Sequence, residues 1–185
     1  MSCSQPPSAR RSVRRSIWAL LALLALPPRG HATTVAPMDV RTLSQRADAV
    51  VVARCVDVTS GVDPLTHRLG TVGRFVVDEV VKGAGVAGEV SVALPGGVAG
   101  REAAPVAGVP RLERGLAAVL FLTAPRADGA RGVLGMDQGA FEITHASDGA
   151  RVRGAAGEAS SGASSARAGT KPLAEFLDEV RSHLR

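Results

Sequence analysis

The chain of 185 residues has no tyrosine, one tryptophan and two cysteines. Trp18 and Cys3 lie in an amino-terminal segment that we expect to be removed, which leaves four phenylalanines and Cys55. Stacking on bases or sugars usually needs exposed aromatic platforms, whereas these phenylalanines lie in apolar runs typical of a core. Because Cys55 then has no partner, we expect no intramolecular disulfide, and an apolar core must provide the stability.

The amino-terminal segment has the three parts of a secretory signal in order. A head with four arginines precedes the apolar run Ile17–Leu26, and two prolines and small residues follow. We predict that residues 1–32 are a signal peptide cleaved between Ala32 and Thr33, and that the mature protein is periplasmic or extracellular. A run of about ten apolar residues is shorter than the ~20 that span a bilayer, so no stable span is expected after cleavage. An uncleaved anchor is the alternative, and general or twin-arginine export both stay open.

The net charge of +5 comes from the same segment. Residues 1–32 hold five of the 22 Lys and Arg residues and none of the 17 Asp and Glu residues, which leaves 17 basic and 17 acidic residues in the remainder. Nucleic-acid binding normally requires a basic patch or stripe. We therefore predict no nucleic-acid partner.

Residues 33–153 have the apolar pattern of a mainly β domain. Valine-rich or alternating runs predict strands at 49–58, 71–81, 89–94, 116–123, 133–136, 139–145 and 150–153. The runs at 49–58 and 116–123 are apolar enough for central strands, Asp148-Gly149 signals a hairpin, and Gly73 suggests a bend or bulge. Residues 39–47 predict a short helix with Asp39 as N-cap. Long, bent strands with local connections favour a small closed or partly open β-barrel.

The carboxyl-terminal part contains a linker and a helix. Residues 154–170 are rich in Gly, Ala and Ser, a composition typical of a flexible linker. Residues 171–185 predict an amphipathic helix whose apolar face carries Leu173, Phe176, Leu177, Val180 and Leu184. An exposed apolar stripe lowers solubility, so we expect the helix to dock on the barrel, and a tethered helix that binds a partner is the alternative.

A long loop at 95–110, rich in Gly, Pro and Ala, joins two predicted strands. Loops of this length inside a compact domain are often functional or mobile. We expect the contact surface to lie on residues 95–113 and at the open end of the barrel. Its candidate residues are Gly96, Gly97, Arg101, Glu102 and Arg111.

No segment carries a specific catalytic, metal-binding or cofactor-binding signature, and we predict none of these sites. Cys55 could act as a nucleophile with His67 or His145 as base, but a cysteine among valines is usually an inert core residue. Asp57, Asp63 and His67 could converge on a metal, but their spacing matches no ligand pattern.

Three further polar residues have structural explanations. Asp78 and Glu79 are adjacent in a predicted strand, so their carboxylates point to opposite faces and cannot share one substrate. His183 lies near the end of the last predicted helix, where a cation interacts favourably with the helix dipole.

The order of short motifs resembles a known arrangement. These motifs are Ala47–Val52, Phe75–Gly83 ending in VVKG, Val90–Val92, Gly115 and Ala118–Leu122. Over about residues 45–145 the chain resembles an uncharacterised group of secreted bacterial β-barrel domains, some found beside matrixin-type metalloproteases. It is also similar to the netrin/tissue-inhibitor-of-metalloproteinase module, which implies an OB-fold barrel. Those inhibitors chelate the protease zinc through a disulfide-held amino-terminal cysteine, whereas the predicted mature chain begins at Thr33, so that mechanism does not carry over.

These observations favour a secreted or periplasmic, non-enzymatic module that binds another protein or a cell-envelope component. The resemblance adds an alternative, an accessory or inhibitory domain associated with a secreted metalloprotease. A hydrolytic enzyme of unrecognised type is the second alternative, and it requires a pocket in which His67 or His145 meets a carboxylate or Cys55. The sequence leaves the identity of the partner and the oligomeric state open.

Overall fold

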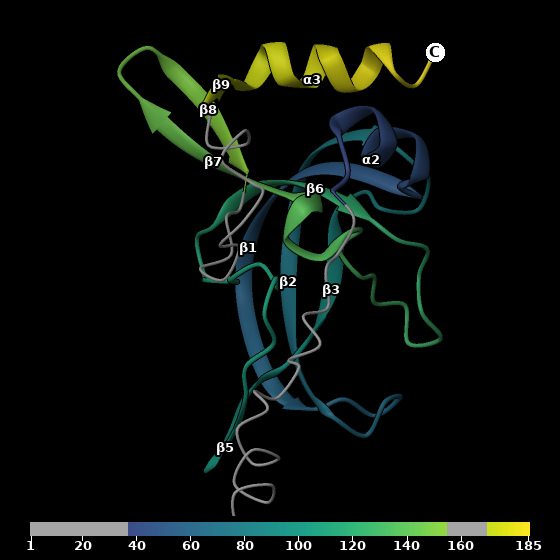
Figure 1. Cartoon of the computed structure of the whole chain (residues 1–185), viewed down its shortest axis with the longest axis vertical. Helices are drawn as coiled ribbons and strands as arrows, with labels where there is room; N and C mark the ends of the chain where they lie inside the picture. Colours follow the sequence, from purple (N-terminus) through teal and green to yellow (C-terminus); the bar gives the residue numbers. More distant parts are fainter. Residues whose placement is uncertain (1–36, 155–169) are drawn as a thin grey trace, which may run out of the picture. The chain divides into compact units, whose positions relative to one another are not determined.

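The fold is mainly β, as predicted, in a computed structural model that describes residues 37–154 and 170–185. One antiparallel sheet has the strand order β3-β2-β1-β6-β7-β8-β9 (Figure 1). Its strands are β1 (Ala49–Val62), β2 (Leu69–Lys82), β3 (Glu89–Pro95), β6 (Ala117–Leu122), β7 (Ala140–Ala146), β8 (Gly149–Gly154) and β9 (Lys171–Pro172). The remaining elements are α2 (Val40–Arg46), the hairpin of β4 (Gly97–Ala99) and β5 (Glu102–Ala104), the 3-10 helix η1 (Met136–Gly139) and α3 (Leu173–Ser182). The predicted signal peptide, its cleavage site and most of the predicted linker lie outside the described residues.

β1 and β6 are the central strands that their apolar runs predicted. β1 pairs with β2 on one side and β6 on the other, and β6 also pairs with β7. Residues of both strands alternate between two apolar clusters, one on each face of the sheet. A strand buried on both faces needs a nearly continuous apolar run, which explains the sequence of both strands. The pairing of β1 with β2 extends to Val62 and Leu69, so both strands are longer than the predicted ones at 49–58 and 71–81 and the connection between them is shorter.

An interior cluster lies against one face of the sheet. It comprises Ala49, Val51, Ala53, Cys55, Phe75, Val86, Val90, Val92, Leu94, Ala118, Leu120, Leu122, Val133 and Ala140. Gly73 makes room beside it, because a β carbon there would lie 2.7 Å from Leu112 Cδ1 and 2.8 Å from Phe75 Cε2. This glycine is therefore explained by close packing.

The register of β1 against β2 does not shift at Gly73, where the sequence suggested a bend or bulge. It shifts between Val50 and Val51, between Val52 and Ala53, and between Cys55 and Asp57. Such irregularities increase the local twist and bend the strands. The register irregularities of this pair therefore lie between Val50 and Asp57 of β1, and not opposite Gly73.

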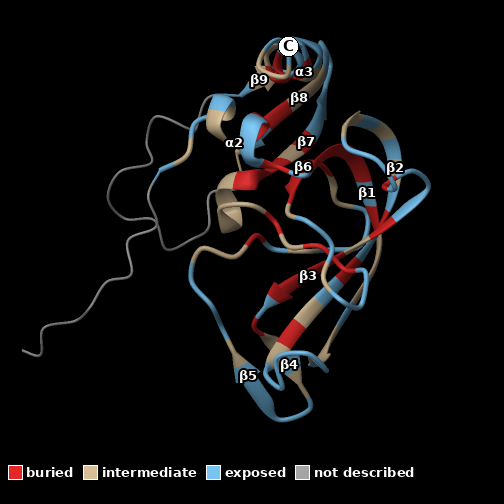
Figure 2. Ribbon diagram, turned by 90° about the vertical axis from the view of Figure 1, so that its right-hand side faces the viewer, coloured by how far each residue is buried: buried red, intermediate tan, exposed pale blue. Residues whose placement is uncertain are grey.

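A helix-side cluster lies against the opposite face, where α2 and α3 cover the sheet (Figures 1 and 2). It comprises Leu43, Ala47, Val50, Val52, Val119, Phe121, Phe141, Ile143, Val152, Phe176, Leu177 and Val180. The Phe176 ring of α3 lies 6.4 Å from the Phe121 ring and 4.7 Å from the Phe141 ring, between centroids. The carboxyl-terminal helix thus docks on the sheet, as expected. Neither helix is long and apolar enough to cross a lipid bilayer, among the residues described.

Two local predictions are confirmed. Asp39 is the N-cap of α2, and its Oδ1 accepts a hydrogen bond from Thr42 N at 2.8 Å. β7 and β8 form the predicted hairpin, in which Ala146 pairs with Gly149 across a two-residue turn. Both features depend on contacts within a few residues, which is why the local sequence specifies them.

The VVKG motif at the end of β2 joins the sheet to α2. Lys82 Nζ donates to Ser44 O at 2.8 Å and to Gln45 O at 3.1 Å, near the end of the helix. Gly83 has a φ of 97°, and a β carbon there would lie 2.8 Å from Asp48 O. The lysine thus satisfies carbonyl groups of α2, and the glycine allows the chain to pass close to the start of β1.

The segment after β6 does not form the strand predicted at 133–136. Arg131 pairs with β3 and Val133 pairs with β6, each as an isolated bridge. Gly135 and Met136 then have φ values of 67° and 61°, a left-handed conformation that a strand cannot include. Closure of the sheet into a barrel is not detected in the described strands, whose order ends at β3 and β9.

Candidate functional site

The loop predicted as the contact surface contains the β4–β5 hairpin. Gly96 and Gly97 form its base and not its surface: Gly96 is buried, and Gly97 is partly buried. A β carbon would lie 2.5 Å from Ala104 O at the first position and 2.5 Å from Thr71 Oγ1 at the second. Both glycines also have positive φ, 84° and 148°. We therefore explain this glycine pair by tight packing of the hairpin on β2.

The other candidates lie beyond this base. Arg101 and Glu102 are adjacent and exposed at the β4–β5 turn. Arg111 lies after the hairpin, and its Nε donates to Glu113 Oε1 at 2.7 Å. The structure thus brings Arg101 and Glu102 together on the hairpin and places Arg111 in a separate ion pair.

Hydroxyl groups attach the hairpin to the far ends of β1 and β2. Thr71 Oγ1 donates to Gly96 O at 2.9 Å and lies 2.9 Å from Ser60 Oγ. Gly96 N also donates to Leu69 O at 2.9 Å. The hairpin and the β1–β2 turn therefore lie at the same end of the domain, at the lower end of Figures 1 and 2. We call residues 59–72 together with residues 95–106 the hairpin end.

Large aliphatic side chains are exposed on the hairpin end. Val62 is 66% exposed, Leu65 48%, Val98 62% and Val106 41%. Val62 and Leu65 lie at the β1–β2 turn, Val98 lies on β4, and Val106 follows β5. These side chains come from two separate segments and leave a large part of their apolar surface in solvent, as is typical of an interaction site.

The remaining exposed aliphatic side chains lie along β2. Within the described ranges, Val72, Val76 and Val80 complete the set of large hydrophobic residues classed as exposed. None of these exposed residues lies on α2, α3 or β7–β9, the part of the domain in which the helix-side cluster is covered. Exposed apolar surface is therefore concentrated on β2 and the hairpin end.

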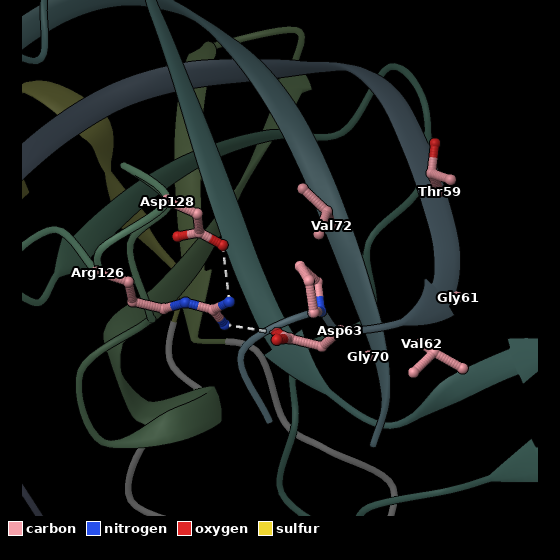
Figure 3. Close-up of a pocket in the computed structure, with 9 residues that line it drawn as sticks. Thr59, Gly61, Val62, Asp63, Gly70, Val72, Arg126 and Asp128 are labelled. Carbon is pink, nitrogen blue, oxygen red and sulfur yellow. Dashed lines mark hydrogen bonds and ion pairs between the residues drawn. The ribbon is translucent and has the colours of Figure 1, made fainter. Parts of the chain in front are cut away.

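A small hollow of about 120 Å³ lies beside the β1–β2 turn (Figure 3). Its lining includes Val62, Val72 and an ion-pair triad. Arg126 Nη1 donates to Asp63 Oδ2 at 2.7 Å, and Arg126 Nη2 donates to Asp128 Oδ2 at 2.8 Å. The triad ties the β1–β2 turn to the loop after β6, and its arginine is already paired with two carboxylates. Its role is therefore to position the turn.

The Arg126 guanidinium beside Asp63 lowers the pKa of that carboxyl from 3.8 to about 2. Hydrogen bonds from the backbone N–H groups of Leu65 and Thr66 contribute to the same shift of the pKa. A carboxyl whose pKa is lower in the folded state stabilises that state above the unfolded pKa. This contribution is lost as the pH falls through about 2.

Asp63→Asn is therefore expected to lower stability at pH 7 and to reduce the loss of stability between pH 4 and pH 2. Urea unfolding midpoints across this range measure both effects. Asp148→Asn is the matched control, because Asp148 forms an exposed ion pair with Arg151. Equal acid sensitivity in Asp63→Asn and the unchanged protein would contradict the assignment.

Cys55 lies in the interior cluster and is 1% exposed. Its Sγ donates to Asp57 O at 3.4 Å, and burial raises the pKa of the thiol. His67 and His145, the bases considered for it, are both exposed. The structure therefore does not form the nucleophile–base pair that the sequence left open.

Because only opening of the core exposes Cys55, native protein should react with a thiol reagent about 100-fold or more slowly than unfolded protein. The release of thionitrobenzoate from the disulfide reagent measures both rates. The same reaction in denaturant is the internal control. Comparable rates in the two conditions would show that Cys55 is accessible in the native state.

The other candidate residues are also separated. Asp63 bonds Arg126, whereas Asp57 Oδ1 accepts from Arg114 Nη2 at 3.1 Å. In the parts of the chain that the structure describes, no three His, Cys, Asp or Glu side chains are grouped to hold a metal ion. Asp78 and Glu79 take different partners, Arg54 and Arg181. His183 is the C-cap of α3.

Sequence reasoning missed Arg126, Asp128 and Arg131. The only local signal was Asp128 beside a glycine, since its Oδ1 accepts from Ala130 N at 3.1 Å in a turn. Each arginine also has one partner far away in sequence: Asp63 for Arg126, and Asp48 for Arg131, whose Nη1 donates to Asp48 Oδ2 at 2.5 Å. The chain matches no model of a known protein family and no curated protein sequence.

Proposed function

We propose that this protein is an exported, non-enzymatic binding module that holds a protein or an envelope component through its hairpin end. One observation carries the proposal: of the seven large aliphatic side chains that are exposed in the described residues, all but Val76 and Val80 lie on the hairpin end. The opposite end, with α2 and α3, buries its apolar side chains in the helix-side cluster. A surface patch that remains uncovered while the rest of the fold is packed is typical of an interaction site.

The packing of Gly96 and Gly97 at the base of the β4–β5 hairpin also supports the hairpin end as the binding surface. Gly96 and Gly97 allow the chain to turn away from β3 directly against Thr71. Hydrogen bonds then fix the base of the hairpin, so that its turn projects with Val98, Arg101 and Glu102 exposed. A rigid base below an exposed turn lowers the conformational entropy that is lost on binding.

We further infer that β1, β2, β3 and β6 form a small OB-like barrel with residues 130–134. The backbone of Arg131 donates to Ser91 O at 2.9 Å and accepts from Ala93 N at 2.8 Å, along the edge of β3. Beyond it, Gly132 O accepts from Thr123 N at 2.9 Å, next to β6. A segment hydrogen-bonded to both strands supports a barrel that encloses the interior cluster, with the hairpin end at one opening.

The binding function is tested with Val62→Ser/Val98→Ser, which changes the two most exposed aliphatic residues. Deletion of the whole loop is a poorer test, because Val109 and Leu112 pack against the interior cluster. Affinity capture from envelope and medium fractions is compared for the unchanged protein, this variant and Val76→Ser, whose valine is 37% exposed on β2. We expect the double variant alone to lose the captured component. Equal capture by all three would contradict the proposal.

A further inference from the structure

We propose that the hairpin end binds the same end of a second copy of this chain, in a two-fold contact along the outer edge of β5. This contact rests on the binding function proposed above and names its partner. Three properties of the hairpin end fit a copy of itself: a strand edge without a neighbour, an apolar row beside that edge, and charges that sum to zero.

β5 is an edge strand in the part of the chain that the structure describes. Its residues Glu102–Ala104 pair with Gly97–Ala99 of β4, and this small sheet contains no third described strand. In an antiparallel pair some backbone N–H and C=O groups point to the partner and others point away, so a strand with one neighbour leaves groups unpaired. Such an edge is a template for another strand. β5 lies at the outer margin of the hairpin end (Figure 2), where a strand of another molecule meets it first.

An apolar row lies beside this edge. Val98 is directly opposite Ala103 in the register of β4 and β5, so the two side chains are on one face of the hairpin. Both residues are exposed. Antiparallel pairing of two β5 edges, centred on Ala103, continues this face into the second copy and covers all four side chains. Pro105 follows β5 and has no N–H group, so the pairing stays short and closes with two copies.

The charges of the hairpin end fit a copy better than a partner that carries one sign of charge. The end and the ion pairs that reach it contain three basic and three acidic residues, namely Arg68, Arg101, Arg126, Asp63, Glu102 and Asp128. Because these charges cancel, two copies approach without net repulsion, and no surface of one sign is attracted. Arg101 and Glu102 are adjacent, exposed and without an ion pair among the described residues, so each copy presents both signs.

A two-fold contact uses the same residues twice. The free edge of β5, the Val98–Ala103 row and the two charges of the turn then each meet a counterpart on the second copy. The contact thus needs no residue that the hairpin end lacks, whereas a different partner must supply its own edge, apolar row and charges.

Sedimentation equilibrium tests the contact. The full chain is expressed, and the form that cells accumulate is purified and identified by its intact mass. Ala103→Lys places a charge in the apolar row and should weaken self-association by about ten-fold or more. Thr144→Lys makes the same kind of change at an exposed position of β7 and should alter self-association by less than about two-fold. Unfolding midpoints show whether each variant keeps its fold.

A pair of charge variants tests whether the partner is a copy. Glu102→Arg makes each hairpin end more positive by two charges, and Arg101→Glu makes it more negative by two. Each variant alone should self-associate about five-fold more weakly, because like ends repel. An equal mixture of the two variants should associate at least as tightly as the unchanged protein. Added salt should reduce the difference, since exposed charges are screened.

The outcomes separate the second copy from the binding function. A dimer that Ala103→Lys and each charge variant weaken, and that mixing restores, supports the two-fold contact. Protein that is monomeric at every concentration, while Val62→Ser/Val98→Ser abolishes capture of another component, overturns the second copy and leaves the binding function standing. A dimer that Ala103→Lys does not weaken, or that mixing does not restore, also overturns the contact. Absence of both self-association and capture removes the proposed function as well.

Discussion

Phe121→Ala is expected to reduce the free energy of unfolding by about 3–5 kcal/mol. Phe121 is fully buried in β6 and packs against two other rings of the helix-side cluster. Its ring centroid is 5.7 Å from that of Phe141 and 6.4 Å from that of Phe176, both in edge-on geometry. Truncation removes these contacts and leaves a cavity between the sheet and α3. Urea unfolding measures the loss.

A double-mutant cycle separates this cluster from the interior one. Phe121→Ala and Phe176→Ala should couple by about 0.5–1.5 kcal/mol, because the two rings are in contact. Phe75→Ala and Phe176→Ala should add to within about 0.5 kcal/mol, since Phe75 lies in the interior cluster. Equal coupling in both cycles, or a cost below about 1.5 kcal/mol for Phe121→Ala, would contradict the two-cluster description.

Arg131→Ala is expected to cost about 3 kcal/mol, the second largest effect. Arg131 is 6% exposed, and its Nη1 donates to Asp48 Oδ2 and, at 2.9 Å, to Thr123 O. Its backbone also bonds β3, so one residue connects β3, the start of β1 and the end of β6. Asp48 is half exposed and stays hydrated after the change, which places the cost at the lower end for a buried pair.

Arg153→Ala is the matched control for this prediction. Arg153 donates to Glu142 at 2.9 Å across the β7–β8 hairpin, but its side chain is 57% exposed. Exposed pairs of this kind contribute about 0–1 kcal/mol. Unfolding midpoints and slopes in urea distinguish the two variants. A cost for Arg131→Ala no greater than that for Arg153→Ala would show that the buried Arg131 side chain does not hold Asp48, at the start of β1, to the end of β6.

The parts of the fold that were predicted correctly are those whose residue pattern fits a single kind of structure. The valine run of β1 and the apolar run of β6 indicated central strands, and both faces of these strands are buried. The stripe containing Phe176 and Val180 indicated a docked helix for the same reason. The segment at 133–136 was predicted wrongly, because the left-handed backbone at Gly135 and Met136 depends on tertiary contacts and not on local apolar pattern.

Less of the candidate site was predictable. The loop containing Arg101 and Glu102 was selected by its length and composition, and it forms a hairpin exposed at its turn. The glycines at its base were selected with it, but their packing against Thr71 and Ala104 is a long-range contact that composition does not encode. The exposure of Val62 and Val98 could not be predicted either, because the sequence alone does not show whether the fold buries an apolar residue.

The central claim is that the hairpin end is the contact surface of this protein, and site-specific photo-crosslinking tests it most directly. A benzophenone side chain at position 98 is compared with one at position 144, where Thr144 is exposed on β7. The probe reacts with C–H bonds of protein or lipid, so it does not presuppose the partner. We predict an adduct from position 98 and none from position 144. Equal adducts from both positions, or an adduct from position 144 alone, would contradict the claim.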